Sequence, residues 1–219
     1  MNDKRLSDRA AYKRSIRVRN AVLILLCIIS ILPFYLMFVN ATRSSNEVKS
    51  GISFFFGNYL SQNIATFDQK QQGLGVTAYK AMLNSLLVSV PFTALSVYFS
   101  ALTAYGIHAY DFKAKKFAWA FILGVMMVPT QVYAVGFYKF MIKLGLIDTY
   151  WPLIIPAITT PAVVFFMRQY LVGALPLEVI EAARIDGSGE FHTFNTVVLP
   201  IMKPALATQA IFQFVASWN

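Results

Sequence analysis

Charged residues are scarce in this chain of 219 residues. Asp, Glu, Lys and Arg make up 13% of it, whereas hydrophobic residues make up 57%. A soluble globular domain has about a quarter charged residues and about half apolar ones. The composition therefore excludes an ordinary soluble domain. It leaves a membrane protein, because a helix needs about 20 apolar residues to cross the hydrocarbon layer.

Residues for covalent and metal chemistry are equally few. The chain has one cysteine, Cys27, and two histidines, His108 and His192. One cysteine forms no intramolecular disulfide and no cysteine-based metal site. We expect no acid, histidine and nucleophile to meet at one membrane depth, which argues against a membrane enzyme. The phosphate-binding pattern GxxxxGK[ST] does not occur, so ATP hydrolysis would have to be carried by another polypeptide.

Long uncharged runs are what the chain does have. Four are long enough to cross a bilayer: Ala21–Val39, Ala81–Tyr110, Phe117–Tyr138 and Thr149–Met167. A fifth begins at Pro204 and reaches Asn219, the last residue of the sequence. The first three runs each contain one proline (Pro33, Pro91 and Pro129), and Pro152, Pro156 and Pro161 crowd the start of the fourth. Each proline predicts a bend that serves either as a hinge or as a packing kink.

Lys and Arg residues predict the orientation of these runs, because cytoplasmic loops carry an excess of positive charge. Seven basic residues lie in segment 1–20, and the loop after the second run also carries a basic cluster. We therefore expect 1–20 to be a cytoplasmic tail, 21–39 the first transmembrane span, 40–80 an extracytoplasmic loop, and 168–203 cytoplasmic. The same basic residues explain the net charge of +9 without a nucleic-acid partner.

Two amino-terminal features bear on this topology. A cleaved signal peptide is the alternative for residues 1–41, but their apolar run exceeds the usual 7–15 residues. An uncleaved span is the preferred interpretation. Within the extracytoplasmic loop, Ile52–Phe56 is a short aromatic patch that we expect to lie at the membrane interface.

The polar stretch Glu181–Pro200 interrupts the apolar pattern in the carboxyl-terminal half. Pro176 can start a helix, and Leu177–Ile185 then reads as a short helix with Glu178 and Glu181 on one face. Asp186-Gly187 is a turn signal, and Ser188 is a plausible cap for the next helix. That helix is predicted by Phe191, Phe194, Val197 and Val198 at helical spacing, and Leu199-Pro200 would stop it. The expected product is a helix-turn-helix on the inner membrane surface.

This stretch resembles the EAA loop of ABC-importer permeases. That signature runs EAA, three residues, Gly, nine residues, a branched apolar residue, one residue, Leu-Pro. The chain has Glu181-Ala182-Ala183, Gly187, Val197 and Leu199-Pro200 at these spacings, with Val where Ile is usual. Flanking sequences are similar to the sugar-importer branch, in particular to MalG-like maltose permeases. They are Leu144–Pro156, Phe165–Phe191, Val198–Thr208 and Phe212–Asn219. The resemblance covers roughly residues 80–219, and the amino-terminal part only in topology.

The resemblance implies an all-α, polytopic bundle in the cell membrane whose cytoplasmic coupling loop lies at 177–200 within a permease core of 81–219. The family has six spans and this chain covers about five, so we expect a chain truncated at its carboxyl terminus. It also implies several partners: a second permease subunit, a cytoplasmic ABC ATPase dimer that binds ATP and Mg²⁺, and an extracytoplasmic solute-binding protein. The permease itself would bind no cofactor and catalyse no reaction.

By the same resemblance, the residues that couple to the ATPase are Glu181, Ala182, Ala183, Arg184, Asp186, Gly187, Leu199 and Pro200. Glu181 would pair with the ATPase surface, the two alanines would pack into its cleft, and Gly187 would make the turn. A loop that only joins two helices is the alternative that charge and turn signals alone leave open.

Polar residues inside the spans are candidates for the substrate pathway, because transport sites lie near the bilayer midplane. The candidates are Asn84, Gln131, Tyr133 and Gln209, and hydrogen bonding between helices is the alternative role for each. A carbohydrate is the expected substrate. An importer of another small solute such as glycerol phosphate or a polyamine, and a non-transport membrane scaffold, are the alternative functions.

Overall fold

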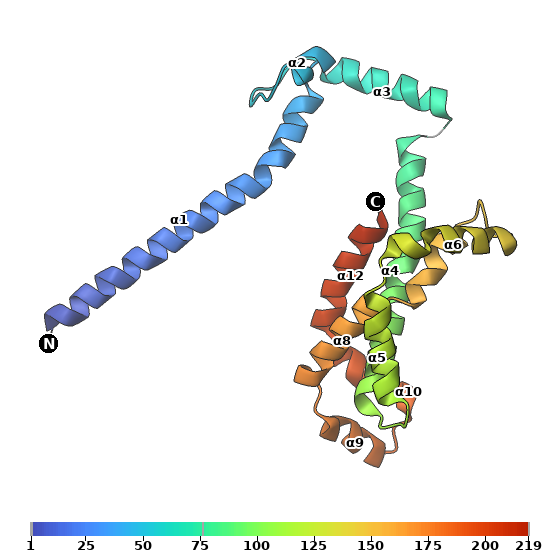
Figure 1. The fold of residues 1–219 in the computed structure, drawn as a ribbon. Coiled ribbons are helices and arrows are strands. Elements are labelled where there is room, and N and C mark those ends of the chain that lie inside the picture. Colours follow the sequence, from blue (N-terminus) through green and yellow to red (C-terminus); the bar gives the residue numbers. More distant parts are fainter. Residues whose placement is uncertain (1, 76, 219) are drawn as a thin grey trace. The chain divides into compact units, whose positions relative to one another are not determined.

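The computed structural model describes residues 2–75 and 77–218. Every regular element within these residues is helical, which confirms the predicted all-α class (Figure 1). The chain divides into two compact units, Met1–Ala78 and Tyr79–Asn219. The first unit contains α1 (Asn2–Ala41), α2 (Ser45–Lys49) and α3 (Leu60–Leu74).

Helix α1 joins the predicted tail and first span in one element of 40 residues. Its part from Ser15 to Ala41 is long and apolar enough to cross a membrane. Pro33 lies inside this helix without ending it. The predicted loop of residues 40–80 contains the two short helices α2 and α3. Helix α2 begins at a capping box, in which Ser44 and Glu47 each bind the other's backbone N–H.

The second unit holds the remaining helices. They are α4 (Ala78–Ala109, whose first residue belongs to the first unit), α5 (Lys115–Met126), α6 (Thr130–Lys143), α7 (Trp151–Ile154), the 3₁₀ turn η1 (Ile155–Ile158), α8 (Pro161–Ala174), α9 (Leu177–Ile185), α10 (Glu190–Thr193), the π-helical segment η2 (Phe194–Val198), α11 (Leu199–Ile201) and α12 (Lys203–Trp218). Pro91 lies inside α4, which continues through it. Proline removes one backbone hydrogen bond, which a long membrane helix tolerates.

The third uncharged run is not the single helix that its hydropathy suggests. It forms α5 and α6, which are bent by 98° at a break that contains Pro129. Pro129 has an extended backbone (φ −60°, ψ 132°) and starts α6. Within residues 2–75 and 77–218, three helices are long and apolar enough to cross a membrane, or up to five if each of two bent pairs is one span. The prediction of about five spans agrees with the upper number.

The core of the second unit lies where α4, α8 and the segment 194–202 meet. Its fully buried side chains include Met167 and Leu171 of α8, Phe194 and Val198 of η2, and Met202. Helix α4 contributes small residues and Tyr105, which is 2% exposed. One residue of α9, Ile180, belongs to the same cluster. The segment after α8 is also held to α4, because His108 Nε2 lies 2.9 Å from the carbonyl oxygen of Leu175.

Candidate coupling loop and substrate pathway

The first arm of the predicted loop is helix α9, whose bounds Leu177–Ile185 are those expected from the sequence. Pro176 precedes it with an extended backbone (φ −61°, ψ 141°), as an N-cap residue requires. Ile180 is 1% exposed, whereas Glu181 and Ala182 are exposed. Helix α9 is therefore anchored by one face and presents an acidic, small-residue face to its surroundings, as predicted.

The turn after α9 is a Schellman motif built on Gly187. The N–H of Ser188 donates to the carbonyl of Ala183 (2.9 Å), and the N–H of Gly187 donates to that of Arg184 (3.0 Å). Gly187 has φ +81°, a left-handed conformation that costs residues with a Cβ about 1–2 kcal/mol. A Cβ at this position would meet nothing within 4 Å, so the requirement for glycine is one of backbone conformation and not of space.

The second arm runs through α10, η2 and α11 and differs from the prediction at both ends. The N-cap of α10 is Gly189, whereas Ser188 accepts a hydrogen bond from the Thr193 hydroxyl (2.8 Å). Leu199-Pro200 does not stop the helix, because both residues lie in α11, which ends at Ile201. Proline is compatible with the first turn of a helical segment, where its missing N–H has no partner to lose. The break lies two residues later, at Met202.

Glu190 connects the second arm to the end of the first arm and to α4. Its carboxylate accepts a hydrogen bond from Arg184 Nε at 2.7 Å and from Tyr105 Oη at 3.3 Å. Tyr110 Oη donates to the same carboxylate oxygen as Tyr105 does, and the Arg184 guanidinium lies 5.3 Å from the Tyr110 ring centroid. The hydrogen bonds from Arg184 and then Tyr110 hold the pKa of Glu190 below its ordinary value. We call Arg184, Glu190, Tyr105 and Tyr110 the Glu190 cluster.

An open hollow of ≈ 530 Å³ lies on the loop surface. Its lining includes three of the predicted coupling residues, Ala183, Asp186 and Gly187, together with Ser188, Gly189, His192, Thr196 and Val197. Glu181 and Ala182 are exposed but do not line it. Leu199 packs against the core, and Pro200 is exposed. The structure thus brings part of the predicted set together, while Arg184 points into the Glu190 cluster.

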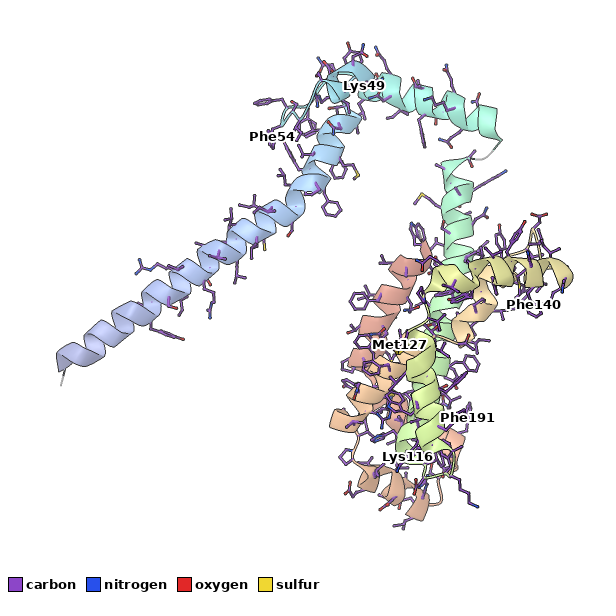
Figure 2. All side chains as sticks on the ribbon, viewed as in Figure 1. Lys49, Phe54, Lys116, Met127, Phe140 and Phe191 are labelled. Atoms are coloured by element: carbon purple, nitrogen blue, oxygen red, sulfur yellow. The ribbon has the colours of Figure 1, made fainter. Side chains whose placement is uncertain are left out.

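Sequence reasoning missed the exposure of two large apolar side chains on this loop, one of which, Phe191, it had grouped by helical spacing with the buried Phe194 and Val198. Ile185 is 87% exposed and Phe191 is 65% exposed, on either side of the turn (Figure 2 labels Phe191). Helical spacing contained a signal for Ile185, because it lies four residues after Glu181 and so shares the exposed face of α9. The sequence offered no comparable signal for the partnership of Glu190 with Tyr105 and Tyr110, which lie 85 and 80 residues away.

The candidates for the substrate pathway are spread over three helices. Asn84 lies on α4, and Gln131 and Tyr133 lie on α6, all of them exposed. Gln209 lies on α12 and is 7% exposed. Among the residues that the structure describes, no hydrogen bond joins any two of these four side chains. Their part in transport stays a prediction.

Comparison with known proteins gives a consistent result. The family described as "Binding-protein-dependent transport system inner membrane component" matches residues 9–219. The chain is 36% identical over 193 residues to the arabinooligosaccharides transport system permease protein AraQ of Halalkalibacterium halodurans, covering 87% of this chain and 68% of that protein. It is 29% identical over 205 residues to the sn-glycerol-3-phosphate transport system permease protein UgpE of Brucella abortus, covering 92% of this chain and 72% of the relative.

A solved structure has the same fold. It is the crystal structure of a bacterial ABC transporter involved in the import of the acidic polysaccharide alginate. The TM-score is 0.73 at 22% sequence identity, and the match covers 94% of this chain and 71% of the other. With a family match over 9–219 and a relative above 30% identity, the chain belongs to the family of inner membrane components of binding-protein-dependent transport systems.

Proposed function

We propose that this chain is a permease subunit of an ATP-driven importer and that its EAA loop docks onto a separate cytoplasmic ABC ATPase. The observation that carries the proposal is the form of the loop. A short helix anchored by Ile180 is followed by a fixed Schellman turn, and the exposed face carries both a charge and apolar side chains. Family membership supports a role in transport, and the form of the loop supports docking onto an ATPase.

The docking surface consists of exposed groups that have no internal role in the fold. Glu181 would pair with a basic group of the ATPase, and Ala182 would allow close approach. Ile185 and Phe191 would bury their exposed side chains against it, since exposed apolar groups that cluster on a surface mark contact sites. The hollow beside Gly187 would receive a side chain of the ATPase. ATP and Mg²⁺ would bind only to the ATPase, and its closure would move the loop and reorient the pathway.

A carbohydrate is the proposed substrate class. The arabinooligosaccharide permease relative supports it, as does a lactose transport system permease protein of Rhizobium radiobacter, 29% identical over 202 residues. The glycerol-3-phosphate permease relative favours a second candidate, a sugar-like phosphate ester. A second permease subunit would complete the pathway, and an extracytoplasmic solute-binding protein would deliver the substrate. The amino terminus would be cytoplasmic.

Co-purification with the ATPase tests the coupling proposal. The full chain is expressed with its partner permease and ATPase, solubilised in detergent, and captured by a tag on this chain. The Glu181→Lys variant should lose most of the ATPase. Asp111→Lys is the matched control, because Asp111 is also exposed and the change in charge is the same. Equal ATPase recovery with both variants would show that Glu181 does not contact the ATPase.

Uptake by the reconstituted assembly tests the substrate class. We expect an arabinooligosaccharide to be transported and sn-glycerol-3-phosphate to compete poorly. The reverse preference would establish the phosphate ester as substrate and leave the coupling proposal intact.

A further inference from the structure

The loop between α2 and α3 carries an unusually apolar tip. Ile52, Phe54, Phe55 and Phe56 are 78%, 52%, 81% and 62% exposed. We call these four residues the aromatic tip. Three exposed phenylalanines in succession are costly in water, because the hydrophobic effect favours removing such surface from it. Some apolar environment should therefore cover them.

The aromatic tip folds back along α1. Tyr35 Oη donates a hydrogen bond to the carbonyl of Phe54 at 2.7 Å. The rings of Tyr35 and Phe56 pack edge to face with centroids 6.0 Å apart. Tyr35 precedes Ala41, the last residue of α1, by six residues, and a helix rises 1.5 Å per residue. The tip therefore lies about 9 Å inside the carboxyl-terminal end of that helix.

A compact base fixes this reversal of the chain. Arg43 is 9% exposed and donates to Asn40 Oδ1 at 3.1 Å and to the carbonyl of Gly51 at 3.0 Å. The N–H of Gly57 donates to Thr42 Oγ1 at 2.8 Å. A Cβ on Gly57 would lie 2.5 Å from the carbonyl oxygen of Thr42, so only glycine permits this approach. The tip is thus held from both of its ends and is not a loose loop.

Helix α3 repeats the same chemistry. Leu60, Ile64 and Phe67 recur at positions i, i+4 and i+7 and are 47%, 53% and 54% exposed. Such spacing forms one apolar stripe on a helix. Gln62 and Thr66 lie between them, and Asp68 and Lys70 follow them, so α3 is an amphipathic helix with an exposed apolar face. Helices of this kind lie in the interface plane of a membrane.

We propose that the aromatic tip and the stripe on α3 form a lipid anchor, seated in the membrane interface at the carboxyl-terminal end of α1. Depth is the argument for lipid over a soluble partner. Interfacial elements bury their apolar face about 5–10 Å into the boundary between head groups and acyl chains. The tip lies about 9 Å back along α1, which gives it this depth where the end of the candidate span Ser15–Ala41 meets the membrane surface. Aromatic side chains are the residues enriched at this level. The anchor is independent of the proposed transport function.

Figure 2 shows Phe54 in the loop beside the end of α1 and Lys49 on α2, apart from it. These positions supply a matched pair for a depth measurement. The only cysteine of the sequence, Cys27, is replaced by serine, and a nitroxide label is attached at Phe55→Cys or at Lys49→Cys. The full chain is placed in nanodiscs of phosphatidylcholine and phosphatidylglycerol. Collision rates of each label with oxygen and with a water-soluble nickel complex are then measured.

We expect the label at position 55 to collide several-fold more with oxygen than with nickel, and the label at position 49 to show the opposite preference. Nickel access at 55 equal to that at 49 would overturn the proposal. Protection of the label at position 55 from both oxygen and nickel would overturn the proposal as well, because a second copy of the chain would then cover the tip. Ile52→Cys should repeat the result at 55, and neither change removes the contacts of Tyr35.

Discussion

The coupling loop and helix α6 occupy the same compact unit but are built in different ways. The loop sends Ile180, Phe194 and Val198 into the core, where they are at most 1% exposed. Among the α6 side chains that the structure describes, only Met141 is buried, at 8% exposed, while Val132, Tyr133, Val135, Tyr138 and Phe140 are 54–71% exposed. The position of the loop is therefore set by contacts within this chain. The surface of α6 is left for lipid or another subunit.

This difference separates residues that anchor an element in the core from residues that are available to contact lipid or another protein. On α9, one isoleucine is buried and another, five residues later, is exposed. On α6, most of the large apolar residues are exposed. Substitutions of similar chemistry should therefore have large effects on stability at the loop anchors and small ones at the exposed positions.

The largest expected effect is that of Ile180→Ala. Removing a fully buried isoleucine side chain typically costs about 2–5 kcal/mol, because transfer energy is lost and a cavity is left. We expect the free energy of unfolding of the detergent-solubilised chain to fall by about this amount, measured by denaturant unfolding. The matched control is Ile185→Ala, whose side chain is 87% exposed. It should change stability by at most about 0.5 kcal/mol and should weaken ATPase co-purification instead. Equal destabilisation by both variants would contradict the division of α9 into an anchored and an exposed face.

Gly187→Ala should have the next largest effect. A Cβ in the left-handed region costs about 1–2 kcal/mol, so the variant should unfold more easily and recover less ATPase. Gly173→Ala supplies a control of opposite sign. Gly173 lies within α8 with open space at its Cβ position, and alanine is favoured over glycine in a helix by up to about 1 kcal/mol. If Gly173→Ala has a melting temperature equal to or lower than that of Gly187→Ala, backbone strain is excluded as the reason for glycine in the turn.

Local signals predicted the first helix and the turn of segment 177–200. Pro176, the Asp186-Gly187 turn and the apolar spacing act over a few residues, and α9 has the predicted bounds. Ser188 failed as a cap because Gly189 takes that position and the Ser188 hydroxyl bonds to Thr193. Prolines were harder to interpret. Pro33 and Pro91 lie inside continuous helices, whereas Pro129 lies at a break.

Contacts between residues far apart in the chain could not be predicted from the sequence. Nothing local indicates that Glu190 meets Tyr105 and Tyr110, because the packing of α4 against the loop brings them together. The same holds for Tyr35 and Phe56, whose contact depends on the chain reversal around Arg43. The aromatic patch at 52–56 could be recognised from composition, but its depth along α1 could not.

Glu190→Gln should have a smaller effect than either substitution above. Its partner Arg184 is exposed, and exposed ion pairs contribute little, so the melting temperature should fall by about 1–2 °C.

The lowered pKa of Glu190 adds a pH dependence. A carboxyl whose pKa falls on folding stabilises the protein above its unfolded pKa of about 4.3, and this stabilisation is lost as pH falls through the folded value. The gap between wild type and Glu190→Gln should stay constant above about pH 5 and close below about pH 4. Glu178→Gln, without a described ion pair, is the control. A gap that persists in acid would show that Glu190 acts through shape and not through charge.

The smallest effect on stability is expected on α6, where Tyr133→Ala should change the free energy of unfolding by at most about 0.5 kcal/mol because the ring is exposed. Tyr138→Ala, on the same helix and 59% exposed, is the matched control. If the pathway passes Tyr133, as its polar hydroxyl and aromatic face predict, the reconstituted assembly should show a raised KM for the sugar with Tyr133→Ala and an unchanged KM with Tyr138→Ala. A raised KM with both variants would point to a general disturbance of α6, and no change with either would remove Tyr133 from the substrate pathway. Either result would leave the loop anchors untouched, because the exposed surface of α6 is free to serve transport without contributing to the core.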